Sequence, residues 1–170
     1  MGFAFPVGVV TAIYLVEYAK DDMFTRFLRL AVRCLAGVPS VVFGLFGLTF
    51  FVIFLRFGSS LLSAGLTLGC LALPVIVGAS ESALLAVPQD HRDASYAMGA
   101  THWQTIRKVV LPAAFPSIIT GAVLSVGRVA GETAPIIFTG AAFYTPGIAK
   151  SLFDEIMALP YLSLIHISEP

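Results

Sequence analysis

Charged residues are scarce in this chain: Asp, Glu, Lys and Arg make up 12% of its 170 residues, whereas 58% are hydrophobic. A soluble domain carries about 25% charged residues, so this chain has too few to cover the surface of a soluble globule. The formal net charge is zero, which gives no electrostatic reason to expect a nucleic-acid partner. We therefore expect lipid, rather than water, to surround most of the molecule.

Cysteine and histidine are also rare, and they do not form the patterns of disulfide or metal sites. The two cysteines, Cys34 and Cys70, lie in or near apolar runs, so a structural disulfide is not expected. The three histidines lack the spacing of metal ligands, and we predict no metal site. The sequence has no G-x-x-x-x-G-K-[ST] phosphate loop and no Ser–His, paired-Asp or H-E-x-x-H arrangement. These absences argue against ATP hydrolysis by this chain and against an intramembrane hydrolase.

Apolar runs, by contrast, are abundant. A helix of twenty residues rises about 30 Å, the thickness of the hydrocarbon layer, and lipid offers no partner for backbone amides, so such runs form helices. Glycines and prolines inside them are tolerated in membranes, where they permit close packing and kinks. The sequence thus predicts an all-α, polytopic helical membrane protein with spans over 2–18, 35–55, 61–85 and 115–138.

The distribution of Lys and Arg predicts the orientation of these spans. Seven of these residues lie in the connections 19–34 and 86–114, whereas the connection 56–60 and the region after 138 hold one each. Basic residues concentrate in cytoplasmic loops, so we expect the first two connections to be cytoplasmic. The chain would then begin outside the cytoplasm, and we expect a membrane helix to precede it in a longer protein.

The cytoplasmic connection 88–112 has the features of two short helices joined at a glycine. A first helix is predicted over 89–98, with Gly99 in the left-handed position after its end. The T-x-x-Q sequence at 101–104 is a capping box that begins a second helix, and Pro112 predicts its end near the preceding residue. From spacing alone, an amphipathic hairpin lying on the lipid headgroups explains the pattern equally well.

The same connection resembles the E-A-A signature of ABC-importer permeases. Asp93-Ala94-Ser95, then Gly99, then Val109-Val110-Leu111-Pro112 match its spacing, with Asp in place of Glu, Ser in place of Ala and Val in place of Ile. In that family the stretch is the coupling helix, which docks into a cleft of the ATPase subunit. The resemblance therefore implies ATPase coupling by Asp93, Ala94, Ser95, Gly99, Trp103, Val109, Leu111 and Pro112.

Three further stretches, VGVVTAIYLVEYA, LAGVPSVVFGLFGL and GRVAGETAPIIFTG, resemble the PstA-type permease subunit of phosphate importers. The resemblance implies a type I ABC importer transmembrane domain of MetI-like fold over 2–160, with about four of the family's six helices present. It also implies a multi-pass location in the bacterial inner membrane. The residues 162–170 do not continue the family pattern, and we predict a non-native tail there.

The resemblance further implies what surrounds the chain. The expected partners are a second permease subunit of PstC type, a dimer of ATPase subunits, an extracytoplasmic phosphate-binding protein and membrane lipid. ATP and Mg²⁺ would be bound by the ATPase partner, so this chain would hold no cofactor and would not be an enzyme. Two alternatives stay open: the permease of another oxyanion or small-solute importer, such as molybdate or tungstate, and a structural membrane subunit that transports nothing.

Besides Glu17 at the end of the first span, three charged residues lie within the predicted spans. Arg128 and Glu132 are four residues apart in an apolar run, where each charge costs about 2.5–3.5 kcal/mol on insertion scales. They are predicted to share one helix face and to pair, either as a structural ion pair or as part of a substrate path, because guanidinium suits phosphate oxygens. Glu81, near the end of its span, is interpreted as a side chain that snorkels to the interface.

Overall fold

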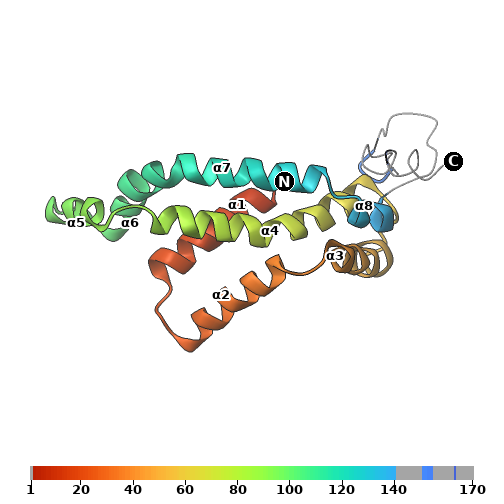
Figure 1. Ribbon diagram of the computed structural model, residues 1–170, viewed down its shortest axis with the longest axis horizontal. Coiled ribbons are helices and arrows are strands. Elements are labelled where there is room, and N and C mark those ends of the chain that lie inside the picture. Colours follow the sequence, from red (N-terminus) through yellow and green to blue (C-terminus); the bar gives the residue numbers. More distant parts are fainter. Residues whose placement is uncertain (1, 141–150, 155–162, 164–170) are drawn as a thin grey trace. The chain divides into compact units, whose positions relative to one another are not determined.

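The computed structural model describes residues 2–140, 151–154 and 163, and every regular element in these ranges is a helix. The all-α prediction is therefore confirmed (Figure 1). The chain folds as two compact units. One consists of 2–36 and 73–125, and the other consists of 37–72 together with the part that follows 125. We call the first the elbow unit, because it contains the elbow, the two short helices that are joined at Gly99. We call the second the α8 unit, after its helix Ala134–Thr139, and we describe each unit by itself.

The elbow unit is built on two antiparallel apolar helices and the first helix of the chain. A π-helical turn, η1, continues α1 directly, and another, η3, joins α6 to α7 without a break. Only residues 73–85 of α4 and 111–125 of α7 belong to this unit. Its elements are α1 (Ala4–Ile13), η1 (Tyr14–Tyr18), α2 (Met23–Ala36), α4 (Leu61–Leu85), α5 (Gln89–Ala97), α6 (His102–Thr105), η3 (Ile106–Val110) and α7 (Leu111–Ala130).

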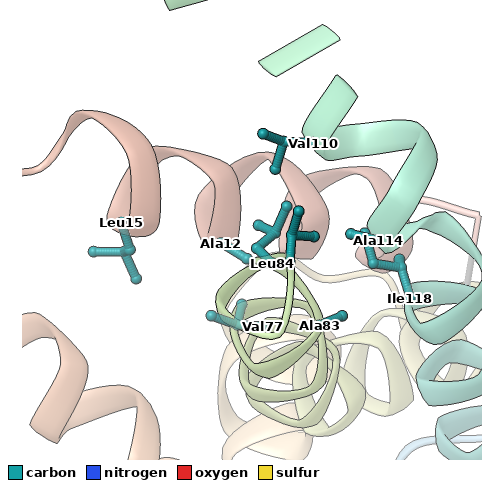
Figure 2. Close-up of a cluster of buried hydrophobic side chains, with 9 residues drawn as sticks. Ala12, Leu15, Val77, Ala83, Leu84, Val110, Ala114 and Ile118 are labelled. Atoms are coloured by element: carbon teal, nitrogen blue, oxygen red, sulfur yellow. The ribbon is translucent and has the colours of Figure 1, made fainter. Parts of the chain in front are cut away.

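The core of the elbow unit lies where α1, α4 and α7 meet (Figure 2). Two glycines let the helices approach closely. A Cβ on Gly8 of α1 would lie 2.7 Å from Ile76 Cγ2 of α4, and a Cβ on Gly121 of α7 would lie 2.6 Å from Ala79 Cβ. Packing of this kind replaces the hydrophobic effect as the driving force between helices in lipid. The buried residues of the core are Ala12, Leu15, Val77, Ala83, Leu84, Val87, Val110, Ala114 and Ile118.

The α8 unit packs a short helix against the continuous helix Ser40–Phe54. A Cβ on Gly44 would lie 2.8 Å from Phe138 Cδ2, and a Cβ on Gly47 would lie 2.1 Å from Thr67 Oγ1. Bare backbone at these two positions therefore allows α3 to lie against α8 and α4. The elements of this unit, besides the parts of α4 and α7 that enter it, are α3 (Ser40–Gly47), η2 (Leu48–Phe54) and α8 (Ala134–Thr139).

Two helices in the described part of the chain are long and apolar enough to cross a membrane, Leu61–Leu85 and His102–Ala130. The first has the bounds that the sequence predicted. The pair of α2 and the α3–η2 helix passes the same test only if it is counted as one bent span, and the apolar helix Ala4–Tyr18 is shorter. The predicted span over 35–55 was placed too early, because its helix begins at Ser40 after an extended Pro39.

The helix α2 was not predicted from the sequence. It occupies most of the connection that we expected to be a basic loop, and it is strongly amphipathic. Its arginines recur at i, i+3 and i+7, as Arg26, Arg29 and Arg33, which is the spacing of one helical face. That periodicity was visible in the sequence, and it separates the three guanidinium groups from the exposed apolar side chains Phe27 and Leu30.

Candidate functional site

The connection between α4 and α7 folds as the glycine-jointed elbow that the sequence predicted. The helix α5 begins directly after Pro88, and Gly99 has φ +81°, a left-handed conformation that strains residues with a Cβ. Thr101 Oγ1 accepts a hydrogen bond from the Gln104 amide, and the Gln104 side chain accepts one from the Thr101 amide. Both halves of the predicted capping box are thus present.

The second arm of the elbow differs from the prediction. We expected a short helix that ends before Pro112, but α6 runs through η3 into α7 as one continuous helix, His102–Ala130. Proline inside an α-helix removes one hydrogen bond and crowds the carbonyl four residues earlier. The π-helical turn Ile106–Val110 ends two residues before Pro112 and contains the carbonyl four residues before it, so its wider backbone can relieve that clash. The helix therefore continues through the proline without an interruption.

The eight predicted coupling residues divide into two groups in the structure. Those with exposed side chains or backbone form the outer surface of the elbow, together with Met98, which is 88% exposed. Ser95 instead braces the elbow, because its hydroxyl lies 2.9 Å from the Thr105 hydroxyl on the other arm. The exposed group is Asp93, Ala94, Gly99, Trp103 and Pro112, and the half-buried group is Ser95, Val109 and Leu111.

The elbow is also tied to the end of the first helix, at a contact that sequence reasoning missed. Arg92 Nη1 lies 2.5 Å from Glu17 Oε1, and Arg92 Nη2 donates a hydrogen bond to the Leu84 carbonyl at 3.1 Å. The side chains of Glu17 and Arg92 are only 4% and 12% exposed. Buried charges of this kind are found paired because an isolated one is expensive. A lone carboxylate in an apolar run was the available signal, but its partner lies 75 residues away.

A histidine completes this junction from the other arm of the elbow. His102 Nε2 lies 3.1 Å from the Glu17 carbonyl oxygen, and His102 Nδ1 lies 2.7 Å from the Tyr96 hydroxyl. The His102 ring also packs edge-on against Tyr18, with a centroid distance of 5.2 Å. Neutral imidazole satisfies both contacts if Nε2 donates to the carbonyl and Nδ1 accepts from the phenol. The end of η1 is thereby held by both arms of the elbow.

Arg128 and Glu132 lie together, but not on one helix as predicted. Arg128 is in the last turn of α7, which ends at Ala130, and Glu132 follows that end. The Gly131 and Glu132 amides bond to carbonyls three residues earlier, which tightens and terminates the helix. The Arg128 Nε and Glu132 Oε1 atoms are 3.9 Å apart, and the Arg128 side chain is 50% exposed. Among the described residues, Glu132 is the only partner of this guanidinium, so most of its donors stay unused there.

Glu81 does not snorkel, so that interpretation was wrong. It is 8% exposed and lies inside the elbow unit, with Arg29 Nε at 3.5 Å from its Oε1 atom. The physical reason is the unpredicted helix α2, which brings Arg29 against α4 and supplies the counter-charge that the sequence alone did not locate. Arg29 also donates a hydrogen bond of 2.7 Å to the Leu15 carbonyl.

Comparison with known proteins gives one family and several relatives. A family model described as "Binding-protein-dependent transport system inner membrane component" matches residues 4–168. The phosphate transport system permease protein PstA 1 of Mycobacterium tuberculosis is 42% identical over 168 residues, which cover 98% of this chain and 54% of the relative. PstA of Mycobacterium leprae gives the same identity and coverage. YqgI of Bacillus subtilis, by name an ABC transporter permease protein, is 42% identical over 83% of this chain and 48% of its own length. The chain thus spans about half the length of these relatives.

Proposed function

The chain belongs to the family of binding-protein-dependent transport system inner membrane components, and on this premise we propose that it is a permease subunit of an ATP-driven phosphate importer. Membership makes it a membrane protein and a transport subunit rather than an enzyme, and it confirms the resemblance found in the sequence. The phosphate assignment is supported by relatives that are named phosphate transport permeases and match 98% of the chain. Because the chain spans about half of their length, we assign the activity to the full-length protein that carries this sequence.

The complex that we propose contains a second permease subunit, a dimer of ATPase subunits and an extracytoplasmic phosphate-binding protein in the bacterial inner membrane. The sequence has no phosphate loop of its own, so ATP and Mg²⁺ would bind to the ATPase subunits. The exposed apolar side chains of the elbow, Met98 and Trp103, support docking of this surface into a protein cleft. Two smaller groups, Ala94 and Gly99, are exposed beside them and would permit close approach.

The observation that carries this proposal is the way in which the elbow is braced and joined to α7. Its two arms are joined by the Ser95–Thr105 hydrogen bond, and its second arm continues into a membrane-length helix without a break. Closure of the ATPase dimer would therefore displace α7 together with the elbow. A loop of the same length without these contacts would absorb the displacement instead.

Arg128 is the residue that we propose to meet the anion during transport. Its guanidinium is half exposed and lies 3.9 Å from a single carboxylate, Glu132. That distance is at the limit of an ion pair, so the positive charge is moderated and most donors stay available. A charge that is held this loosely can bind phosphate and release it again.

The proposal is tested by ATP-dependent uptake of labelled phosphate into vesicles that contain the full-length protein and its partners. Arg128→Gln should abolish uptake while leaving assembly of the complex intact, and Arg128→Lys should retain part of it. The matched control is Arg26→Gln, which removes an exposed guanidinium of α2. Normal phosphate uptake by the Arg128→Gln complex would refute the role of this residue. Stimulation of the ATPase by molybdate or tungstate, and not by phosphate, would refute the phosphate assignment.

A further inference from the structure

A cavity of about 330 Å³ lies between α2 and α4 in the elbow unit. Small-molecule sites have volumes of about 300–1,000 Å³, so this cavity is large enough for a small ligand with its water. Apolar side chains from both helices form most of its wall. Its polar lining comes from Arg33 of α2 and from Glu81 and Ser82 of α4.

Glu81 is a carboxylate without a hydrogen-bond donor. The residue is 8% exposed and its Oε1 atom is buried, and it makes no hydrogen bond to any residue that the structure describes. Its nearest cationic atom, Arg29 Nε, lies 3.5 Å away, which is too far for a hydrogen bond and leaves that nitrogen without a partner as well. Buried polar atoms are almost always satisfied, so an unsatisfied one indicates a missing water, ion or ligand. The group that Glu81 needs is a hydrogen-bond donor.

Arg33, which lines the same cavity, needs a hydrogen-bond acceptor. Its guanidinium makes no hydrogen bond or ion pair with another residue in the described ranges. Guanidinium offers five donors in a planar fork that matches the oxygens of a tetrahedral oxyanion. A ligand that satisfies both walls must therefore carry acceptor oxygens for Arg33 and a proton for Glu81.

We propose that this cavity binds a protonated phosphate group, with Arg33 donating to its oxygens and its P–OH donating to the Glu81 carboxylate. This inference rests on the proposed function, because phosphate is the solute assigned there, and it adds a specificity-determining residue, Glu81. Inorganic phosphate keeps at least one proton at neutral pH, whereas sulfate, molybdate and tungstate keep none. Sulfate, molybdate or tungstate would place an unprotonated oxygen next to the Glu81 carboxylate. The repulsion between the two negative charges would exclude these anions.

The same chemistry occurs in two sources. Free inorganic phosphate carries the P–OH group, and so does the phosphomonoester headgroup of phosphatidic acid. The phosphodiester headgroups of other phospholipids have no P–OH and would meet Glu81 with an unprotonated oxygen. The experiment therefore needs one arm for the free anion and one for each class of lipid.

The binding test uses a thiol as a reporter at the mouth of the cavity, where Ser82 is exposed. The full-length protein carries Ser82→Cys with Cys34→Ser and Cys70→Ala, in nanodiscs of phosphatidylcholine, and the rate of maleimide modification is measured. Phosphate should slow modification, and sulfate at equal ionic strength should require at least about a tenfold higher concentration for the same protection, because one charged hydrogen bond corresponds to roughly that factor in affinity. Slowing by phosphatidic acid, and not by free phosphate, would assign the same site to a lipid.

Two variants and two controls connect the protection to the proposed contacts. Glu81→Gln should remove the preference for phosphate over sulfate, and Arg33→Gln should remove protection by either anion. The matched controls, Asp21→Asn and Arg26→Gln, alter an exposed pair outside the cavity and should leave protection unchanged. If Glu81→Gln does not fold, the comparison of phosphate with sulfate in the reporter protein still tests whether the cavity prefers a protonated anion.

Equal protection by phosphate and sulfate, or none by phosphate or by phosphatidic acid, would overturn the inference. The assay requires no ATPase and no transport, so its outcome is separate from that of the uptake experiment. Protection by phosphate in a protein whose complex imports another solute would retain the site and refute the proposed function. Phosphate uptake without phosphate-selective protection would refute the site and retain the proposed function.

Discussion

The contact between Glu17 and Arg92 predicts a large and specific loss of stability when one partner is removed. Arg92→Met would leave the Glu17 carboxylate, 4% exposed, without its counter-charge. Removing one member of a buried ion pair costs about 3–5 kcal/mol, because the remaining charge is uncompensated in a medium of low dielectric constant. Glu17→Met should cost about the same, since Arg92 would keep only its hydrogen bond to the Leu84 carbonyl.

The double variant separates the interaction energy of the pair from the cost of leaving one buried charge without a partner. With both residues replaced by methionine no charge is buried, and apolar replacements of a buried pair are often close to neutral. A remaining cost of about 1 kcal/mol is expected from the Leu84 carbonyl, which loses a donor. The double variant should therefore be more stable than either single variant, with a coupling energy above about 2 kcal/mol.

The assay is the loss of helical circular dichroism of the full-length protein in mild detergent, as sodium dodecyl sulfate is titrated in. A matched control cycle uses Asp21 and Arg26, whose side chains are 76% and 70% exposed at a similar separation of 2.9 Å. The Arg26 guanidinium, which hydrogen-bonds Asp21, holds the pKa of that carboxyl below its ordinary value, but such an exposed pair should couple only weakly. If the Glu17–Arg92 double variant is as unstable as the sum of its single variants, the reasoning is refuted.

Three further predictions concern local geometry, and each is measured by the same unfolding titration. Gly121→Val should destabilise the protein by about 1–3 kcal/mol, because a Cβ there meets Ala79 Cβ at 2.6 Å, whereas Gly65→Ala, with nothing within 4 Å, should be tolerated. Gly99→Ala should cost about 1–2 kcal/mol because the residue has φ +81°; a cost no greater than that of Gly65→Ala would contradict this. Thr101→Ala should cost about 1 kcal/mol through loss of the capping box, and a wild-type transition midpoint would show that the cap contributes nothing.

The sequence was sufficient wherever a local rule determines the structure. The helix Leu61–Leu85 has the predicted bounds because a long apolar run follows Gly58-Ser59-Ser60 and ends shortly before Pro88. The elbow follows from the left-handed Gly99 and the capping box at 101–104, which depend on neighbours only a few residues away. Local rules failed at Pro112, where a π-helical turn with buried Ile106 and Val110 precedes the proline and the helix continues.

Contacts between distant segments could not be predicted in the same way. Nothing in the residues around Glu17 identifies Arg92 as its partner, and nothing around Glu81 identifies Arg29. The first pair depends on how η1 packs against α5, and the second depends on how α2 packs against α4. Neither packing can be predicted from composition. The proposed tail over 162–170 falls outside the described residues except for Ser163, and the predicted domain boundaries stay predictions.

The π-helical turn Ile106–Val110 also fixes the rotational phase of everything that follows it. An α-helix advances about 100° per residue, and a π-turn accommodates one residue more than the α-helical ladder would. Were these residues wound as ordinary α-helix, Ala114 and Ile118 would be turned about a quarter of a revolution away from the core that they now fill. The π-turn thus takes up one residue without turning α7, and deleting one residue of this segment should convert it to ordinary α-helix while Ala114 and Ile118 still face the core.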